Sequence, residues 1–161
     1  MLKIDDLRHI VILKNLTDEM LHKLIPLSDI QKYKKGEFVF RGGESSKHFF
    51  LLKRGKILLE KRLSESITVS VGSIKPGYSF GWSSMLGGNA YTSDAICAET
   101  SEVFALDGTK LIETMQNDHS MAYGICQILL RVMKSRLDLR TEQFLHVLTH
   151  HPEIGNLLEN K

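Results

Sequence analysis

The spacing of apolar residues along the chain changes twice. Over residues 4–29 they recur three and four positions apart, as at Leu21, Leu24 and Ile25. This is the period of one face of a helix. Thr17 precedes two acidic residues, as expected of a helix N-cap. The pattern predicts short helices over 4–29.

Over residues 36–107 the pattern becomes strand-like. Short runs rich in β-branched and aromatic residues are separated by glycines or by Pro-Gly. Regularly spaced short strands with such turns are typical of small barrels and jelly rolls. The runs are 37–41, 48–53, 55–61, 66–74, 93–99 and 101–107.

The helical period returns after residue 107, and helices are predicted over 108–148. The first is short, with Asp107 or Thr109 as its N-cap. The second begins at 119 and contains no proline. Its apolar residues form two neighbouring rows, which is more than one packing surface requires. We expect one row to pack on the β-domain and the other to contact the same helix of a second subunit. The predicted dimer interface is Ile125, Ile128, Val132 and Leu139. A helix buried wholly within its own domain remains the alternative.

Together these patterns predict an α+β fold, mainly β, in a single domain over 1–150 with a tail at 151–161. The jelly roll, or double-stranded β-helix, is flanked by N-terminal helices and a long C-terminal dimerisation helix. The chain has 161 residues, enough for one core.

No apolar stretch suits a signal peptide or a membrane span, so we expect a cytoplasmic protein. We also expect both cysteines, Cys97 and Cys126, to be reduced core residues.

Charge narrows the possible partners. The 21 basic and 19 acidic residues create no overall field towards nucleic acid or an anionic membrane.

Residues 77–95 are rich in hydrogen-bonding groups. Their glycines let the backbone expose N–H groups, and their serines and threonines add hydroxyls. Such groups cradle anions. The stretch contains no Arg or Lys.

The order of these elements resembles the cyclic-nucleotide-binding domain of the catabolite-activator/FNR superfamily. Residues 34–59 match the glycine and apolar positions of its opening strands, and residues 75–84 match the approach to its phosphate-binding cassette. The resemblance extends over about residues 10–148. It implies the same fold, and it implies little about the ligand because the matching glycines are turn positions.

The cassette corresponds to residues 81–93 in this chain. The side chains through which this family contacts its ligand are absent from it. Trp82 stands where a glutamate would accept the ribose hydroxyl, and Thr92 where an arginine would pair with the phosphate. Asp94 replaces a small alanine. Losing one desolvated charged contact costs on the order of 2–5 kcal/mol. The sequence therefore disfavours conventional binding of cyclic AMP or cyclic GMP.

The Gly-Trp-Ser version resembles a stand-alone subset of the superfamily that has no helix-turn-helix domain. The long helix of that subset carries a pattern close to Tyr123-Gly124, Arg131, Arg136-Leu137 and Arg140 here. Arg131 lies where family members close this helix over the ligand. It would then supply the cation that the cassette lacks, although a solvated basic face is the simpler interpretation.

Three interpretations of Trp82 remain open. It stacks on a planar ligand in a remodelled pocket, or it fills the vacated pocket, or it is an ordinary core residue. The predicted ligand-binding residues are Gly81, Trp82, Ser83, Ser84, Tyr91, Thr92, Ser93 and Arg131. The ligand is a small molecule of unknown identity.

The sequence favours a non-enzymatic regulatory or sensor domain that signals through its dimer helix. The alternative is a ligand-free protein-interaction module with a degenerate pocket. His48 is the only histidine of the sheet region, which argues against a metal-dependent cupin. No nucleophilic-catalysis spacing is visible, and we expect neither a metal nor another cofactor. Because no recognition helix follows residue 148, direct DNA binding is not expected.

Overall fold

The computed structural model describes residues 3–151. The chain divides into two compact units, with the border between Ile125 and Cys126, and each unit is described by itself. The predicted single domain over 1–150 stays a prediction. The predicted tail at 151–161 lies, apart from His151, outside the described residues.

Short helices open the first unit, as predicted. The Thr17 hydroxyl accepts a hydrogen bond from the backbone N–H of Met20, which confirms Thr17 as an N-cap. The helices are α1 (Ile4–Arg8), η1 (Val11–Leu13), α2 (Asp18–Leu24) and η2 (Ile25–Leu27). The predicted helical range extended to residue 29, which is too far. Ser28 already begins strand β1 (Ser28–Tyr33), which pairs with the last strand of the sheet.

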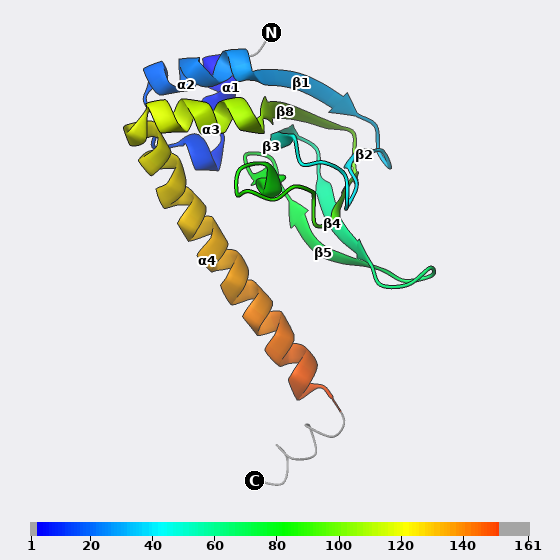
Figure 1. The fold of residues 1–161 in the computed structure, drawn as a ribbon. Coiled ribbons are helices and arrows are strands. Elements are labelled where there is room, and N and C mark those ends of the chain that lie inside the picture. The colour runs from blue at the N-terminus through cyan, green and yellow to red at the C-terminus, as the bar shows by residue number, and fades with distance from the viewer. Residues whose placement is uncertain (1–2, 152–161) are drawn as a thin grey trace. The chain divides into compact units, whose positions relative to one another are not determined.

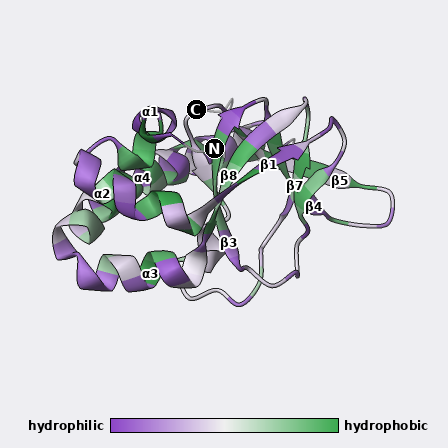
Figure 2. Cartoon of the chain, turned by 90° about the horizontal axis from the view of Figure 1, so that it is seen from above, coloured by the Kyte–Doolittle hydropathy of each residue, from purple (hydrophilic) through white to green (hydrophobic). Residues whose placement is uncertain are grey.

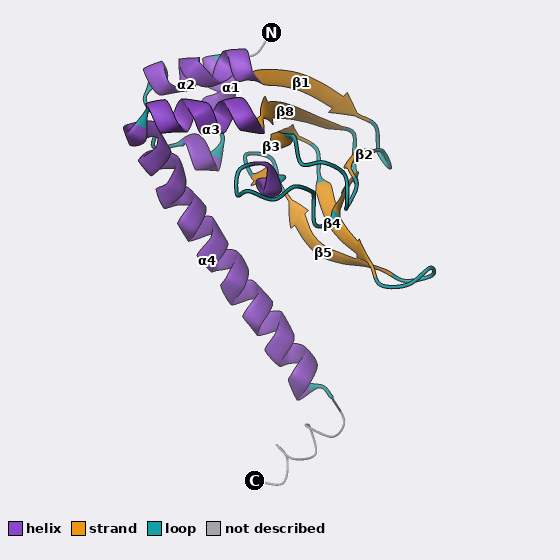
Figure 3. Ribbon diagram, viewed as in Figure 1, coloured by secondary structure: helices purple, strands orange, loops and turns teal. Residues whose placement is uncertain are grey.

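Two four-stranded antiparallel sheets form a jelly roll, in the orders β1-β8-β3-β6 and β2-β7-β4-β5. The remaining strands are β2 (Phe38–Phe40), β3 (His48–Arg54), β4 (Ile57–Arg62), β5 (Thr68–Ile74), β6 (Ser79–Phe80), β7 (Asp94–Cys97) and β8 (Ser101–Asp107). Figure 3 shows α1–α3 gathered at one end of the strands and the β4–β5 hairpin at the other. The α+β jelly-roll prediction is confirmed.

Strand β3 separates two layers of the core, because successive side chains of a strand point to opposite faces. Phe50 and Leu52 belong to the cluster between the two sheets. Phe49 and Leu51 are also buried, but they lie outside that cluster and hence on the opposite face. In the hydropathy colouring of Figure 2, apolar and polar residues alternate along α2 and α3, as expected of helices with one buried face.

Helices α3 (Gly108–Asn117) and α4 (His119–Thr149) follow β8, as Figure 1 shows. Asp107 is the N-cap of α3, since its carboxylate accepts a hydrogen bond from Lys110 N at 3.0 Å. Asp118 caps α4 by accepting from Met121 N at 2.9 Å. Its other oxygen lies 2.6 Å from the ammonium of Lys23, which ties α2 to the junction between α3 and α4.

The four residues of the predicted dimer row on α4 differ in exposure, and the row itself stays a prediction. Ile125 and Ile128 are only 1% and 2% exposed. Val132 is half-buried and Leu139 is 52% exposed. The prediction that both cysteines are buried is confirmed for Cys97 and wrong for Cys126, which is exposed. No helix within residues 3–151 combines the length and the apolar character that crossing a bilayer requires.

A buried carboxylate on β8 links the sheet to the amino-terminal helix. Glu102 is 7% exposed. Its oxygens lie 2.7 Å from the Arg54 guanidinium and 3.1 Å from the Lys53 ammonium. Lys53 also contacts Asp6 of α1 at 3.1 Å. The hydrogen bond from Arg54 lowers the pKa of Glu102 below its ordinary value, although burial acts in the opposite direction.

We expect the Glu102→Gln variant to lose about 1–2 kcal/mol of unfolding free energy at pH 7, because the paired charge is removed from a buried site. A lowered folded-state pKa stabilises the fold above the unfolded value of about 4.3 and stops doing so as pH falls through the folded value. The difference between variant and wild type should therefore shrink below about pH 4. Urea unfolding across pH measures it. Glu99→Gln, at an exposed position, is the control and should show little difference at any pH.

Candidate functional site

The turn that begins at Gly81 has the left-handed glycine and short helix expected of the predicted cassette. Gly81 has a left-handed φ of 78° and is the N-cap of the short 3-10 helix η3 (Trp82–Ser84). A Cβ at this position would lie 3.0 Å from the Phe50 ring and 3.1 Å from the His48 carbonyl oxygen. Glycine is therefore required here both for its φ and for the close approach to β3.

Trp82 packs on the outer face of β3. Its ring centroid lies 5.0 Å from that of Phe49, with the ring planes tilted by 58°. Trp82 does not belong to the cluster between the sheets. Of the three interpretations of this residue, the contact with Phe49 favours a packing role. A role in ligand binding stays a prediction.

Tyr91 belongs to the core between the sheets. It is 6% exposed, and its ring stacks on Phe40 with the centroids 3.7 Å apart. Its hydroxyl donates to the His48 carbonyl oxygen at 2.8 Å and accepts from His48 N at 3.1 Å. Burial raises its pKa. The hydroxyl is therefore engaged by the backbone of β3, and the prediction that Tyr91 contacts a ligand is corrected to a structural role.

Aromatic rings fill the space around Tyr91. The Phe50 and Phe80 centroids are 5.2 Å apart, and Phe40 lies 5.6 Å from Phe50 and 5.9 Å from Phe80. All four rings belong to one buried cluster. The interior of the jelly roll beside the cassette is thus occupied by side chains.

The far end of the cassette is tied to the loop between β2 and β3. Asp94 accepts a hydrogen bond from Gly42 N at 2.7 Å, so its carboxylate has a structural partner. Thr92 is exposed and Ser93 is half-buried. No basic side chain stands at these positions, as the sequence already indicated. Arg131 is exposed on α4, in the second unit, and its predicted role stays untested.

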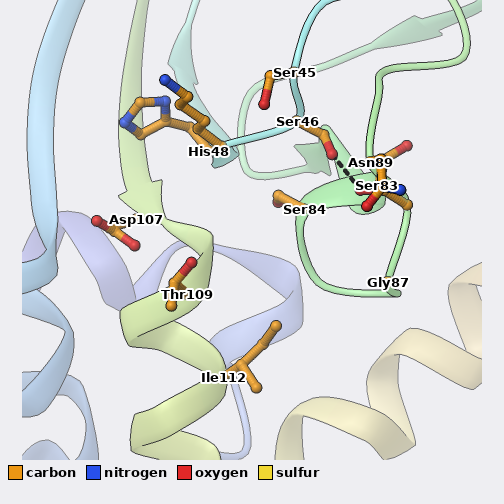
Figure 4. Close-up of a pocket in the computed structure, with 12 residues that line it drawn as sticks. Ser45, Ser46, His48, Ser83, Ser84, Gly87, Asn89, Asp107, Thr109 and Ile112 are labelled. Carbon is orange, nitrogen blue, oxygen red and sulfur yellow. Dashed lines mark hydrogen bonds between the residues drawn. The ribbon is translucent and has the colours of Figure 1, made fainter.

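A cavity of about 500 Å³ opens beside the cassette. Figure 4 shows Ser83 and Ser84 of η3 across from Thr109 and Ile112 of α3. The cavity is lined by Ser45, Ser46, Lys47, His48, Ser83, Ser84, Gly87, Gly88, Asn89, Asp107, Thr109 and Ile112. Of the predicted ligand-binding residues only Ser83 and Ser84 line it. Within residues 3–151, no three His, Cys, Asp or Glu side chains are placed to hold a metal ion.

Sequence reasoning missed most of this cavity. Residues 45–48 and the start of α3 carry no motif for ligand binding, and only the folded chain brings them to the cassette. One available indication was Asp107, which was expected to cap a helix. A capped helix start next to a serine-rich turn places many hydrogen-bonding groups close together.

Comparisons with known proteins agree with this architecture. The family model for the cyclic nucleotide-binding domain matches residues 30–118. The human cGMP-dependent protein kinase 2 is 28% identical over 101 residues, which are 62% of this chain and 13% of the kinase. An uncharacterized protein of Mycobacterium tuberculosis is 29% identical over 111 residues, 64% of this chain and 21% of that protein. The chain thus spans only a small part of these relatives.

Solved structures share the fold. A putative cyclic nucleotide-binding protein from Geobacter metallireducens superposes with a TM-score of 0.73 at 26% identity, covering 85% of this chain and 99% of that one. The sensor domain of the transcriptional regulator DNR from Pseudomonas aeruginosa gives 0.70 at 22% identity, with 86% and 90% covered. A cyclic nucleotide-binding domain from Methylobacillus flagellatus gives 0.79 at 13% identity, with 92% and 88% covered. The matched family model spans more than half of the residues, and the chain belongs to the cyclic nucleotide-binding domain family.

Proposed function

We propose that this chain is a non-enzymatic regulatory domain that binds a small molecule beside a remodelled cassette and signals through α4 in a homodimer. One observation carries the proposal. The cassette keeps its left-handed glycine and η3, while Trp82, in the place of the ribose-binding glutamate, packs on Phe49. Retention of the turn backbone together with replacement of the ligand-contacting side chain is better explained by binding of a different ligand than by random decay of the site.

We expect cyclic AMP and cyclic GMP to bind more weakly than about 1 mM. Two charged contacts are missing, and the loss of each costs on the order of 2–5 kcal/mol, so a micromolar site becomes millimolar or weaker. Trp82 is the only tryptophan, so its fluorescence reports on the cassette without a label. A titration followed by fluorescence and by thermal unfolding measures both nucleotides.

The same assay run on a broad panel of metabolites tests the proposed function itself. A ligand at about 100 times its Kd adds about 2.7 kcal/mol of stability, which raises the Tm by several degrees. A Trp82→Phe variant should keep the thermal response and lose the fluorescence change. Micromolar binding of either cyclic nucleotide would contradict the remodelled site.

A row of exposed apolar side chains on α4 supports the homodimer. Leu130, Leu137 and Phe144 recur every seven residues and are 70%, 67% and 62% exposed. A second row with the same seven-residue interval lies next to the first. It is displaced by three residues along the chain and contains Met133, Arg140 and Val147 and, one heptad earlier, Cys126. Two mainly apolar rows of period seven form a coiled-coil seam. A second copy of the same helix carries the matching rows, so it is the partner that this seam fits.

A ligand-free interaction module is the second candidate. The observation that favours it is the aromatic cluster, in which Phe40, Phe50, Phe80 and Tyr91 occupy the interior of the jelly roll. In that case the chain acts through the α4 seam alone. The metabolite panel separates the two candidates, because the module should give no thermal or fluorescence response.

A further inference from the structure

The cavity beside the cassette has walls that are fixed before any ligand arrives. Its walls come from three segments, 45–48, 83–89 and 107–112. Backbone hydrogen bonds join these segments, from Ser46 N to Asn89 O at 3.2 Å and from Gly108 N to Lys47 O at 2.9 Å. Ser45 and Ala90 also form an antiparallel bridge. A binding site that needs no ordering loses less free energy when a ligand binds.

The polar side chains of the cavity fall into two groups. Three have structural partners: Ser46 donates to the Gly88 carbonyl, Ser84 donates to the Gly81 carbonyl, and Asp107 caps α3. Among the described residues, the others make no side-chain hydrogen bond or ion pair. They are Ser45, Lys47, His48, Ser83, Asn89 and Thr109. The uncommitted groups are three hydroxyls, one carboxamide, one imidazole and one ammonium.

These groups select a ligand by charge and by hydrogen bonding. Lys47 supplies one positive charge, and the negative charge of Asp107 is partly offset by the amide dipoles at the start of α3. A ligand with one negative charge is therefore accommodated better than a dianion. Ile112 is the only apolar side chain among the lining residues, so the cavity suits a mainly polar ligand.

We propose that this cavity binds a small hydroxylated monocarboxylate, of the size and kind of a sugar acid. Its carboxylate pairs with Lys47, and its hydroxyls exchange hydrogen bonds with Ser45, Ser83, Asn89 and Thr109. The cavity volume of about 500 Å³ lies within the range of sites for small ligands. This assignment rests on the proposed function, since it names the ligand class and the place of binding.

The position of the cavity also offers a route to α4. Thr109 and Ile112 lie on α3, which ends at Asn117. The next residue, Asp118, caps α4 and contacts Lys23. A ligand that contacts Thr109 and Ile112 therefore acts on the helix that ends next to Asp118, the residue that caps α4.

The test is isothermal titration calorimetry on the full chain, with gluconate as the probe. Glucose carries similar hydroxyls without the charge, and inorganic phosphate carries charge without the hydroxylated body. We expect gluconate to bind at least tenfold more tightly than either. The Lys47→Met variant should lose at least tenfold in gluconate affinity. Lys35→Met, at an exposed lysine outside the cavity, should leave the affinity unchanged.

Three results would overturn the assignment: no gluconate binding, equal gluconate affinity in wild type and Lys47→Met, or tighter binding of phosphate or glucose. Thermal unfolding of each variant checks that it is folded, as expected for a change at an exposed lysine. The proposed function fails separately, when no compound of the broad panel changes the Tm or the Trp82 fluorescence. If a panel compound binds and Lys47→Met leaves its affinity unchanged, sensing stands and the cavity assignment fails.

Discussion

The Leu130→Glu variant is expected to be monomeric at micromolar concentrations at which we expect the wild type to form the proposed dimer. Leu130 is 70% exposed in the single chain, so the substitution leaves the fold of the chain intact. In the dimer it removes two leucines from the seam and places two like charges against each other. The loss of each buried leucine costs about 2–4 kcal/mol, so the dimer Kd should rise by roughly 1000-fold or more. Sedimentation velocity over a concentration series measures this change.

Leu139→Glu is the matched control. Leu139 is also exposed on α4, at 52%, and it belongs to the row that the sequence pattern assigned to the dimer. It lies outside the heptad row of Leu130, Leu137 and Phe144, so we expect less than a tenfold change in dimer Kd. A larger effect at Leu139 than at Leu130 would contradict the heptad seam and restore the original row.

Cys126 tests the direction of the two helices. It lies in the second row of the seam, seven residues before Met133, and it is exposed. In a parallel, in-register dimer the two copies of Cys126 face each other across the seam. Mild oxidation should then give a disulfide-linked dimer, because facing cysteines come within bonding distance. Cys97 is buried, so a Cys126→Ser variant should form no cross-link.

Gly55→Ala is expected to reduce the free energy of unfolding by about 2–5 kcal/mol. Gly55 joins β3 to β4 with a φ of +92°. A Cβ there would lie 2.3 Å from the Ser101 hydroxyl oxygen and 2.7 Å from the Thr100 carbonyl oxygen. The left-handed φ costs a non-glycine residue about 1–2 kcal/mol, and forcing atoms into a filled space costs about 1–3 kcal/mol more. Urea unfolding measures the loss.

Gly36→Ala separates these two costs. Gly36 has a similar φ of +86°, but a Cβ there would meet no atom within 4 Å. Only the conformational cost remains, and we expect a loss of about 1–2 kcal/mol. Equal losses at Gly36 and Gly55 would show that contact with the start of β8 contributes nothing at Gly55.

The strands that alternate or run apolar were predictable from the sequence, and two others were not. Runs such as 48–53 and 101–107 carry enough apolar residues to be recognised as β3 and β8. Strand β1 is mostly polar, and it forms because Ser28 to Tyr33 pair along the edge of β8. Strand β6 has two residues and is defined by its pairing with β3. Pairing partners distant in sequence leave no local pattern.

For the cassette, backbone and side chains differed in how well they could be predicted. Gly81 stands where a left-handed turn needs a glycine, so the turn was visible in the sequence. The surroundings of the Trp82 and Tyr91 side chains were not visible in the sequence. From the same backbone position, each side chain could have packed against several different polar or apolar neighbours. Only the folded chain shows that Trp82 packs on Phe49 and that the Tyr91 hydroxyl bonds to the backbone of His48.

The sequence by itself determined the order of the helices and of the six strands other than β1 and β6, the family fold, and the loss of the glutamate and arginine of the cassette. Local spacing and residue identity carry that information. Only the tertiary structure decided which row of α4 is buried and which groups line the cavity. Ile128 and Leu130 belong to one continuous apolar arc, and covering one of them requires contacts that no local pattern encodes. The cavity likewise exists because distant segments, at 45–48, 83–89 and 107–112, meet when the sheets close.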